Sequence, residues 1–357
     1  MVLEDVEFMA APHAGWPSPT KVGPALLPRP VSPRGMLVYT LINHRSAERG
    51  YPAAMNRMAR TIVGVILVAV GAIALLQYST FGKHEFYDHA VRLDDPVREI
   101  RIDSDSLALD IRFVSSADEN IVRIEGKAGT EVVKRIRSAR AEGGVLRLQF
   151  KDRRWWSFNL FDFNRLNEKQ TVTVSLTDEA MAALESFRVN VDSGSVRIHD
   201  AAVREGVVES DSGSIRIGRM QSDALTVKSD AGSIRLDRFE GGKLSLRSDS
   251  GSIHADAVSA GLNVVSGAGS IMINHLNGYG EIRTDSGSVR IVKDDDTGLD
   301  VSTDSGSVRI TVPASYRGSY DLDSDSGAIR HPDPVGASGE VIKVRTDSGS
   351  IRIEQQP

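Results

Sequence analysis

Acidic side chains recur at fixed spacing in the second half of this chain and are the first candidates for chemistry. An Asp stands two residues before a recurring glycine in eight of nine copies, as in "TDSGSVRI" at 284–291 and again at 303–310. Such an array could bind calcium, but each copy offers one carboxylate, whereas a calcium site collects about six to eight oxygens. We therefore interpret the Asp as a corner residue that accepts a hydrogen bond from a turn amide, and we expect no metal site.

A row of arginines has the same period. An Arg stands three residues after the glycine in seven of the nine copies, and His254 and Met272 interrupt the row. Aliphatic residues flank each Arg, so period-two alternation directs the arginines outward. At about 4.8 Å per copy, guanidinium groups could bind an anionic polymer or lipid headgroups. The row consists of Arg197, Arg216, Arg235, Arg290, Arg309, Arg330 and Arg352, of which the first five are our candidate contacts.

The alternative for the arginine row is a solvated charged face that protects the sheet. Residues 187–357 contain 19 Lys and Arg against 25 Asp and Glu, so interleaved acids can neutralise the row. The whole chain is also acidic, with a net charge of −5, and a nucleic-acid partner is not expected.

Aromatic residues concentrate in "RRWWSFNLFDFNR" at 153–165. One interpretation is a cap that folds over the end of a repeat array, because such arrays need capping. The other is a surface that contacts lipid or a partner, since Trp with flanking Arg is typical of interfaces. The candidate contacts are Trp155, Trp156, Phe158, Phe161 and Phe163.

Residues for catalysis are scarce. The chain has no Cys, which removes thiolate catalysis and disulfides. His199, His254, His275 and His331 fall at different places in their repeats and give no ligand spacing. The acidic run "KDDDTG" at 293–298 is interpreted as a solvated turn, and "HEFYDH" at 84–89 as part of a linker. We expect neither enzyme activity nor a cofactor.

The repeat itself predicts the fold. The nine glycines are separated by 18 to 22 residues, with Val or Ile two residues after each and an aliphatic residue five before. Alternation of period two on both sides indicates strand, tight turn and strand. We expect the glycine to supply a positive φ at the corner and the Ser or Thr three residues earlier to form an inward polar ladder. The corner glycines are Gly194, Gly213, Gly232, Gly251, Gly269, Gly287, Gly306, Gly327 and Gly349.

A unit of about 19 residues cannot bury its own apolar face, whereas stacked units can. The prediction is an all-β chain with a parallel β-solenoid over 187–357, stacked in the order of the sequence. Residues 97–186 read as an irregular β region that precedes it, and 83–96 as a juxtamembrane linker. The final "IRIEQQP" has no evident cap, so that end is blunted by Glu354 and Pro357 or stacks on another copy.

A membrane anchor is predicted upstream. No charged residue stands between Thr61 and Gly82, and the 16 to 22 apolar residues would span about 24–33 Å as a helix. Arg57 and Arg60 precede this run, which places the N-terminus in the cytoplasm and the remainder outside. We favour an uncleaved anchor over a cleaved signal, because "LLQYSTF" lacks the small residues of a cleavage site.

The first 54 residues are rich in Pro and Gly and show no sustained periodicity. They predict a disordered tail. A second hypothesis is that translation starts at Met55, which opens a basic n-region followed by the apolar run. Peptides from residues 1–54 in the native protein would contradict that start site.

The apolar span, the segment "TVTVSLTDEAMAALESFRV" and the recurring "DSGSIRI" coils together resemble the putative adhesin family of bacterial envelope proteins, which includes LiaG-like membrane-anchored proteins. The resemblance covers roughly residues 60–357 and rests mainly on the glycine-centred repeat. It implies a β-solenoid outside the membrane, often associated with envelope-stress systems, and it transfers no catalytic residues.

These patterns favour a non-catalytic binding or scaffold module in the cell membrane, with one span and an extracytoplasmic C-terminal domain. Its expected partners are the membrane together with a cell-wall polymer, lipid headgroups or an envelope protein. Two alternatives stay open. One is a structural protein that assembles end to end into filaments, and the other is a polysaccharide-acting β-helix enzyme, which lacks a cluster of acids and bases.

Overall fold

The computed structural model describes residues 84–151, 169–334 and 336–356. They belong to a compact unit, Thr80–Pro357, which is all-β apart from the short helices α3 (Thr130–Arg137) and α4 (Asp178–Ala183). The predicted membrane segment and the residues before it lie outside the described ranges. Within those ranges, no helix is long and apolar enough to cross a membrane.

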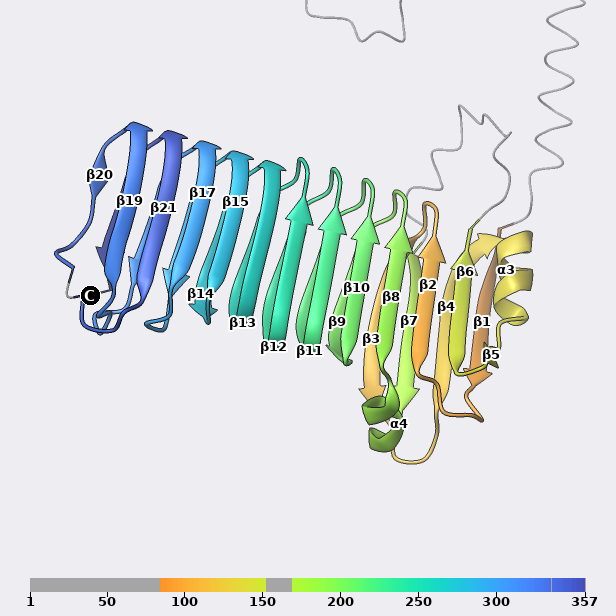
Figure 1. Cartoon of the computed structure of the whole chain (residues 1–357). Coiled ribbons are helices and arrows are strands. Elements are labelled where there is room, and N and C mark those ends of the chain that lie inside the picture. The colour runs from red at the N-terminus through yellow and green to blue at the C-terminus, as the bar shows by residue number, and fades with distance from the viewer. Residues whose placement is uncertain (1–83, 152–168, 335, 357) are drawn as a thin grey trace, which may run out of the picture. The chain divides into compact units, whose positions relative to one another are not determined.

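The strands form two layers that face each other across the core (Figure 1). Three long strands run through both layers: β11 (Ile215–Ser229), β12 (Ile234–Ser248) and β13 (Ile253–Ala268). The first layer also contains, in spatial order, β6 (Val145–Phe150), β2 (Glu99–Ser104), β8 (Ser186–Val191) and β10 (Glu205–Ser210) before these three, then β15 (Gly280–Ser286), β17 (Leu299–Ser305), β21 (Val341–Ser348) and β19 (Ser319–Ser326).

The second layer begins, in spatial order, with β1 (His84–Arg92), β4 (Ile121–Gly129), β7 (Lys169–Leu176), β3 (Ala108–Ser115) and β9 (Val196–Ala202). After the three long strands it continues with β14 (Ile271–Asn277), β16 (Val289–Lys293), β18 (Val308–Val312), β22 (Ile351–Gln355) and β20 (Ile329–Arg330). The two-residue strand β5 (Ala141–Glu142) pairs antiparallel with β6. Apart from β1, β4 and β5, all pairing within the layers is parallel.

Each repeat forms one coil that stacks in register on the next. Ile215 pairs with Ile234, and Val227 pairs with Leu246, exactly one repeat away in each case. Because the register preserves repeat positions, the inward aliphatic residues form continuous columns, which are buried except in the coil of Gly327, where Leu322 is half-buried and Ile329 is exposed. Parallel stacking therefore gives each short coil the apolar partner that it lacks alone.

The inward polar ladder predicted near the corner is confirmed. Ser210, Ser229 and Ser248 are buried, and the hydroxyl oxygen of each accepts a hydrogen bond of 2.9 Å from the backbone N–H of the corner glycine three residues later. The buried hydroxyl thus satisfies an amide that the turn leaves without a strand partner.

The corner glycines are required for close approach, not for a positive φ, which corrects the expectation above. Among the nine, only Gly269 and Gly287 have a positive φ, of 150° and 144°. At every corner, however, the coils approach closely. A Cβ on Gly232 would lie 2.1 Å from the carbonyl oxygen of Gly213, and one on Gly251 would lie 2.0 Å from that of Gly232. Any side chain at this position would push neighbouring coils apart.

We predict that Gly232→Ala lowers the free energy of unfolding by about 1–3 kcal/mol, the typical cost of overpacking. The matched control is Gly261→Ala in β13, where the new Cβ would lie 3.5 Å from the nearest atom, the carbonyl oxygen of Gly242. Denaturant unfolding of the fragment 80–357 measures both. Equal stability of the two variants would contradict the close-approach explanation.

The stack begins earlier in the chain than predicted. The region 97–186 was expected to be irregular, yet β2 pairs in parallel with β8, and β3 with β9, so it contributes regular coils. The segment 83–96, expected to be a linker, contains β1, which pairs antiparallel with β4. Helix α3 packs on β1, β4 and β6 and buries Val132, Val133 and Ile136. It covers the N-terminal end of the stack (Figure 1).

The C-terminal coils are not stacked in the order of the sequence. The last repeat, β21 and β22, lies between the coil of Gly306 and the coil of Gly327. Consequently the exposed end of the stack is formed by β19 and β20, and not by "IRIEQQP" as expected (Figure 1). The physical reason lies in one inward position: the coil of Gly327 has His331 where the last repeat has the buried Ile353.

Cysteine pairs can test this order, because the chain contains no Cys. Ser302 lies opposite Arg345 in β21, and Arg345 lies opposite Asp323 in β19. Adjacent strands are about 4.8 Å apart, within the range of about 4.4–6.8 Å between Cα atoms that a disulfide spans. We therefore expect Ser302→Cys/Arg345→Cys to form a disulfide, detected by non-reducing mass spectrometry.

The control is Ser302→Cys/Asp323→Cys, whose two positions are separated by two coils, or about 9.6 Å. This pair should stay reduced. Stacking in sequence order would reverse the two results, because β19 would then lie directly on β17.

Candidate binding surfaces

The predicted arginine row is present on the outer face of the second layer. Arg197, Arg216 and Arg235 occupy equivalent positions in three successive coils. Beyond the interruption at His254 and Met272, the row resumes with Arg290 and Arg309. These side chains are exposed. The row continues in spatial order with Arg352 and then Arg330, because the last two coils are exchanged.

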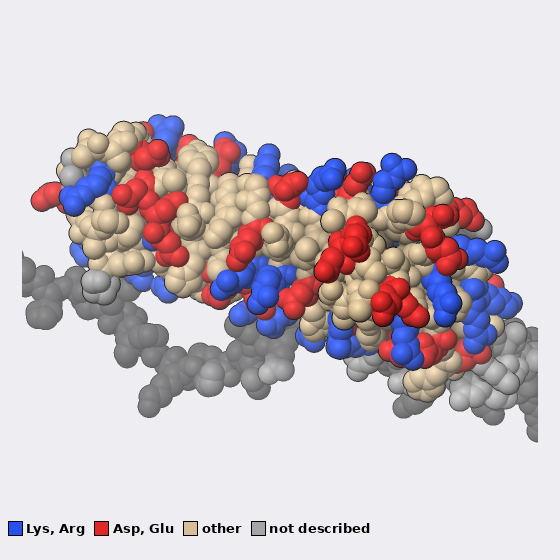
Figure 2. Space-filling view, turned by 90° about the horizontal axis from the view of Figure 1, so that it is seen from below, with Lys and Arg blue, Asp and Glu red and all other residues tan. Residues whose placement is uncertain are grey.

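The row is only partly neutralised. Arg216 and Arg235 both pair with Asp237, each at 3.3 Å, and Arg352 pairs with Glu354. Four members have no ion-pair partner among the described residues: Arg197, Arg290, Arg309 and Arg330. The row thus contains unpaired guanidinium groups beside paired ones. On the side of the molecule seen from below in Figure 2, acidic and basic side chains are interspersed, without a large patch of one sign.

The Asp column at the corners is exposed and differs from our interpretation. No described turn amide donates a hydrogen bond to these carboxylates; the corner amides bond to the neighbouring coil, as when Asp230 N donates to Ser210 O at 3.1 Å. Asp230 and Asp249 instead pair with Lys228 and Arg247, at 3.3 and 3.5 Å. In the described ranges, no group of three or more His, Cys, Asp or Glu side chains is placed to hold a metal ion.

The aromatic candidates lie outside the described residues, which omit 152–168. The placement of Trp155, Trp156, Phe158, Phe161 and Phe163 is therefore untested, and both interpretations of the insert stay predictions. The described chain stops at Lys151, just after β6, and resumes at Lys169, where β7 begins.

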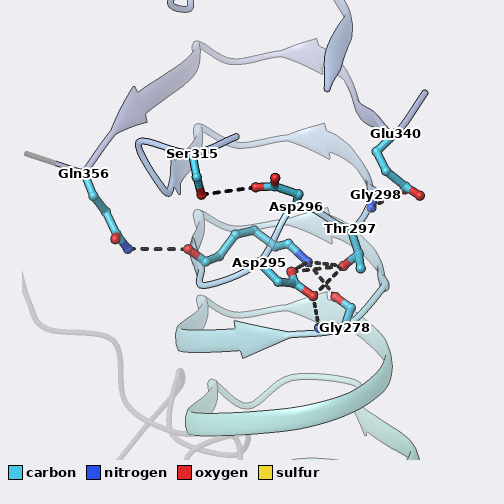
Figure 3. Close-up of polar contacts among 9 residues, drawn as sticks. Gly278, Asp295, Asp296, Thr297, Gly298, Ser315, Glu340 and Gln356 are labelled. Atoms are coloured by element: carbon cyan, nitrogen blue, oxygen red, sulfur yellow. Dashed lines mark hydrogen bonds and ion pairs between the residues drawn. The ribbon is translucent and has the colours of Figure 1, made fainter. Parts of the chain in front are cut away.

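A buried lysine network is the main site that the sequence interpretation missed (Figure 3). Lys293 is fully buried and continues the inward column after Leu276. Its Nζ donates hydrogen bonds to the Gly278 carbonyl at 2.6 Å and to Thr297 Oγ1 at 2.7 Å. The same Nζ lies 2.6 Å from Asp295 Oδ1. The run 293–298, expected to be a solvated turn, therefore folds around a buried cation.

The electrostatics of this network are balanced. Burial lowers the pKa of Lys293, although the nearby carboxylate of Asp295 favours its charged form. Burial opposes ionisation of Asp295, but Lys293, the Thr297 hydroxyl and the Gly278 N–H hold its pKa below the ordinary value. The Gly278 N–H donates to Asp295 Oδ2 at 2.8 Å. Every donor of the ammonium group is used, so the network is structural and offers no free nucleophile.

The network also joins coils that are distant in sequence. The side-chain amide of Gln356 donates to the backbone carbonyl of Lys293 at 3.4 Å. The carboxylate of Glu340 accepts a hydrogen bond of 2.7 Å from the Gly298 N–H (Figure 3). These bonds attach the inserted last repeat to the loop that follows β16. No signal in the sequence indicated this, because six residues after the corner glycine the preceding repeats mostly have polar residues, and only a register shift between β14 and β16 brings Lys293 opposite Leu276.

We predict that Lys293→Met lowers the free energy of unfolding by about 3 kcal/mol, because a partly buried carboxylate loses its cation. The double variant Lys293→Met/Asp295→Asn should recover much of this loss, since Asn can still accept from Gly278 and Thr297. Leu276→Met, at the preceding position of the column, is the control and should cost less than about 1.5 kcal/mol. A double variant no more stable than the single one would contradict the assigned ion pair.

A second polar cluster surrounds Asp110 on β3. Its carboxylate is 1% exposed. One oxygen lies 2.9 Å from His199 Nε2 and 3.1 Å from Arg112 Nε, and the other contacts Lys169. Burial opposes ionisation, but Lys169 and Arg112 together keep the pKa of Asp110 below the ordinary value. With its charge held by three basic groups, Asp110 anchors strands and is not a free base.

His254, His275 and His331 lie in different coils. His275 Nδ1 lies 3.2 Å from Asp294 Oδ2, and the ring of His331 lies 5.5 Å from that of Tyr320. His254 occupies the arginine row on β13.

The stacked coils, with buried aliphatic columns and glycine corners, define an all-β repeat protein. The chain belongs to the Toastrack DUF4097 family, whose profile matches residues 97–354. The match begins before β2 and ends within β22, and so covers nearly all of the described stack.

Several solved structures resemble the chain at low identity. A protein from Parabacteroides distasonis described as a "putative lipid binding protein" is 18% identical, covers 76% of this chain and 98% of its own, and has a TM-score of 0.46. A "putative adhesin" from the same species is 13% identical, with coverages of 76% and 98% and a TM-score of 0.48.

A third structure, a "putative adhesin" from Bacteroides fragilis, is 16% identical, covers 75% of this chain and 97% of its own, and has a TM-score of 0.40. These similarities do not transfer the neighbours' functions to this chain. No curated protein matches it at a significant level.

Proposed function

We propose that the protein is a membrane-anchored, extracytoplasmic β-solenoid that serves as a non-catalytic binding or scaffold module at the bacterial cell envelope. The proposal combines the apolar run at 61–82 with a stack of coils that begins directly after it. Association with an envelope-stress system is part of the same proposal and follows from the family resemblance.

The observation that carries the binding function is the set of unpaired arginines in the row. Arg290 and Arg309 are adjacent in register and have no acidic partner among the described residues. Guanidinium groups held about 4.8 Å apart on a rigid sheet can each donate two hydrogen bonds to a phosphate or carboxylate. A polyanionic wall polymer or an anionic lipid surface presents such groups repeatedly.

The shape of the C-terminal end bears on the alternative of filament assembly. The edge strand β19 carries Asp321, Asp323 and Asp325 on alternate residues, and β20 is only two residues long and is followed by Pro332. Charge, proline and a short strand are the features by which exposed edges avoid pairing. The described C-terminal edge therefore favours the binding module over end-to-end assembly.

The test is co-sedimentation of the fragment 80–357 with anionic liposomes, neutral liposomes and isolated cell wall. We expect the native fragment to bind an anionic surface. In Arg290→Gln/Arg309→Gln, the affinity should fall about tenfold for each arginine removed, which corresponds to the loss of one charged hydrogen bond per arginine. A parallel Trp155→Ala/Trp156→Ala variant tests the aromatic insert.

Arg247→Gln is the matched control, because Arg247 is exposed but already paired with Asp249, and it should bind as the native chain does. Absence of binding to all three surfaces would contradict the proposal and direct attention to protein partners. Binding that is lost only in the Trp variant would move the site from the arginine row to the insert.

A further inference from the structure

A concave pocket lies at the N-terminal end of the stack, away from the arginine row. The end of β1, the link from β1 to β2, the end of α3 and the start of β5 form its walls, and its volume is about 370 Å³. This size lies within the range of small-ligand pockets. Its charged lining consists of Arg92, Asp94, Asp95, Arg137 and Arg140, with His89 beside them.

Most of the charged side chains in this pocket have no ion-pair partner among the described residues. Arg92, Arg140, Asp94 and Asp95 make no ion pair with any described residue, and Arg137 has only Glu85, at 3.8 Å. Elsewhere, arginines of the same domain commonly pair with an acid two residues away, as Arg352 does with Glu354. The charged side chains of the pocket are exposed to solvent, and a ligand that carries both signs would complement them.

The frame of the pocket is fixed while its interior stays open. Val91 and Leu93 are buried, and the Leu93 N–H donates to the Asn120 carbonyl at 2.9 Å. The Ala139 N–H donates to the carbonyl of Ile136 at 3.0 Å, which fixes the end of α3. The other lining residues include Ala90, Ala139 and Ala141, whose small side chains leave room between the charged groups.

We propose that this pocket binds a zwitterion that carries a phosphate and a primary ammonium group, the chemistry of a phosphoethanolamine headgroup. The three guanidinium groups bind the phosphate oxygens, for which their fork geometry is suited. Asp94 and Asp95 bind the ammonium group. A ligand with phosphate alone would face two uncompensated carboxylates, so the pocket favours the zwitterion over a simple phosphate ester.

The position of the pocket in the chain is consistent with a lipid source. Arg92 follows Gly82, the end of the apolar run, by ten residues, which span at most about 34 Å when extended. Because β1 runs from His84 to Arg92, the pocket lies at the far end of this strand, and it meets a headgroup only when the domain lies along the membrane surface. If the ligand is a lipid headgroup, the inference rests on the proposed envelope function. The chemistry of the pocket does not depend on that function.

The experiment is calorimetric titration of the fragment 80–357, a compact unit with its own core, with phosphoethanolamine, glycerol 1-phosphate and ethanolamine. We expect phosphoethanolamine to bind at about millimolar strength or better, and at least about tenfold more tightly than the other two. Arg92→Gln/Arg140→Gln should weaken phosphoethanolamine at least tenfold. Asp94→Asn/Asp95→Asn should remove the preference over glycerol 1-phosphate.

Arg309→Gln, in the arginine row, is the control and should leave this titration unchanged. No binding of phosphoethanolamine, equal binding of glycerol 1-phosphate, or unchanged affinity in the Arg92→Gln/Arg140→Gln variant would each overturn the inference. Thermal unfolding of each variant shows whether a loss of binding reflects misfolding. If the assignment is right, the Arg92→Gln/Arg140→Gln variant loses affinity, whereas the Asp94→Asn/Asp95→Asn variant loses selectivity.

Two vesicle arms separate the lipid from the free compound. Neutral vesicles that contain phosphatidylethanolamine should retain the fragment more than phosphatidylcholine vesicles do, and the pocket variants should lose this difference. If the fragment binds phosphoethanolamine in solution but shows no preference for phosphatidylethanolamine vesicles, the pocket is assigned to a free or polymer-borne phosphoethanolamine group. Because the arginine row is tested with anionic surfaces and other variants, either proposal can fail while the other holds.

Discussion

The close approach of the coils at the glycine corner is the constraint on which the rest of the stack depends. The carbonyl oxygen of one corner glycine occupies the space that the Cβ of the next would need, as at Gly213 and Gly232. The same contact recurs from Gly194 to the last coils. Glycine thereby permits, at one side of every coil, the spacing of about 4.8 Å that parallel strand pairing requires, and the buried aliphatic columns and the serine ladder depend on that stacking.

Departures from the repeat are where the stack acquires individual features. Lys293 replaces an aliphatic residue in an inward column, and the loop that follows it supplies a carboxylate, a hydroxyl and a backbone carbonyl to satisfy the ammonium group. At the N-terminal end, β1 and α3 depart from the coil pattern and create the charged pocket. The regular coils provide rigidity, and the irregular segments provide most of the specific chemistry.

The sequence predicted the repeat unit, its inward and outward residues and the parallel stacking, because these depend on period and composition. The inward Ser and Thr ladder and the outward arginines were placed correctly for the same reason. The role of glycine was mistaken, since a tight corner and a close approach between coils both demand a residue without a side chain. Only the second is a contact between residues about 19 positions apart, which the local pattern does not reveal.

The Lys293 network and the spatial order of the last coils were also missed. Lys293 gave no signal, because it enters the inward column through a register shift that the sequence does not show. His331, which stands where the other repeats have an aliphatic residue, did indicate an end coil. The pocket could not be predicted, because Arg92 and Arg140 are distant in sequence and meet only through the antiparallel pairing of β1 with β4 and the turn of α3.

The inserted last repeat has a consequence for how the chain is completed during synthesis. β21 and β22 leave the ribosome after β19 and β20, yet they occupy the position between that coil and the coil of β17. The edge of β17 therefore acquires its neighbour β21 only after residues 341–348 have emerged. A chain that stops short of residue 341 would lack the buried Ile342, Val344, Ile351 and Ile353. Correct stacking of the C-terminal coils thus requires residues 341–355.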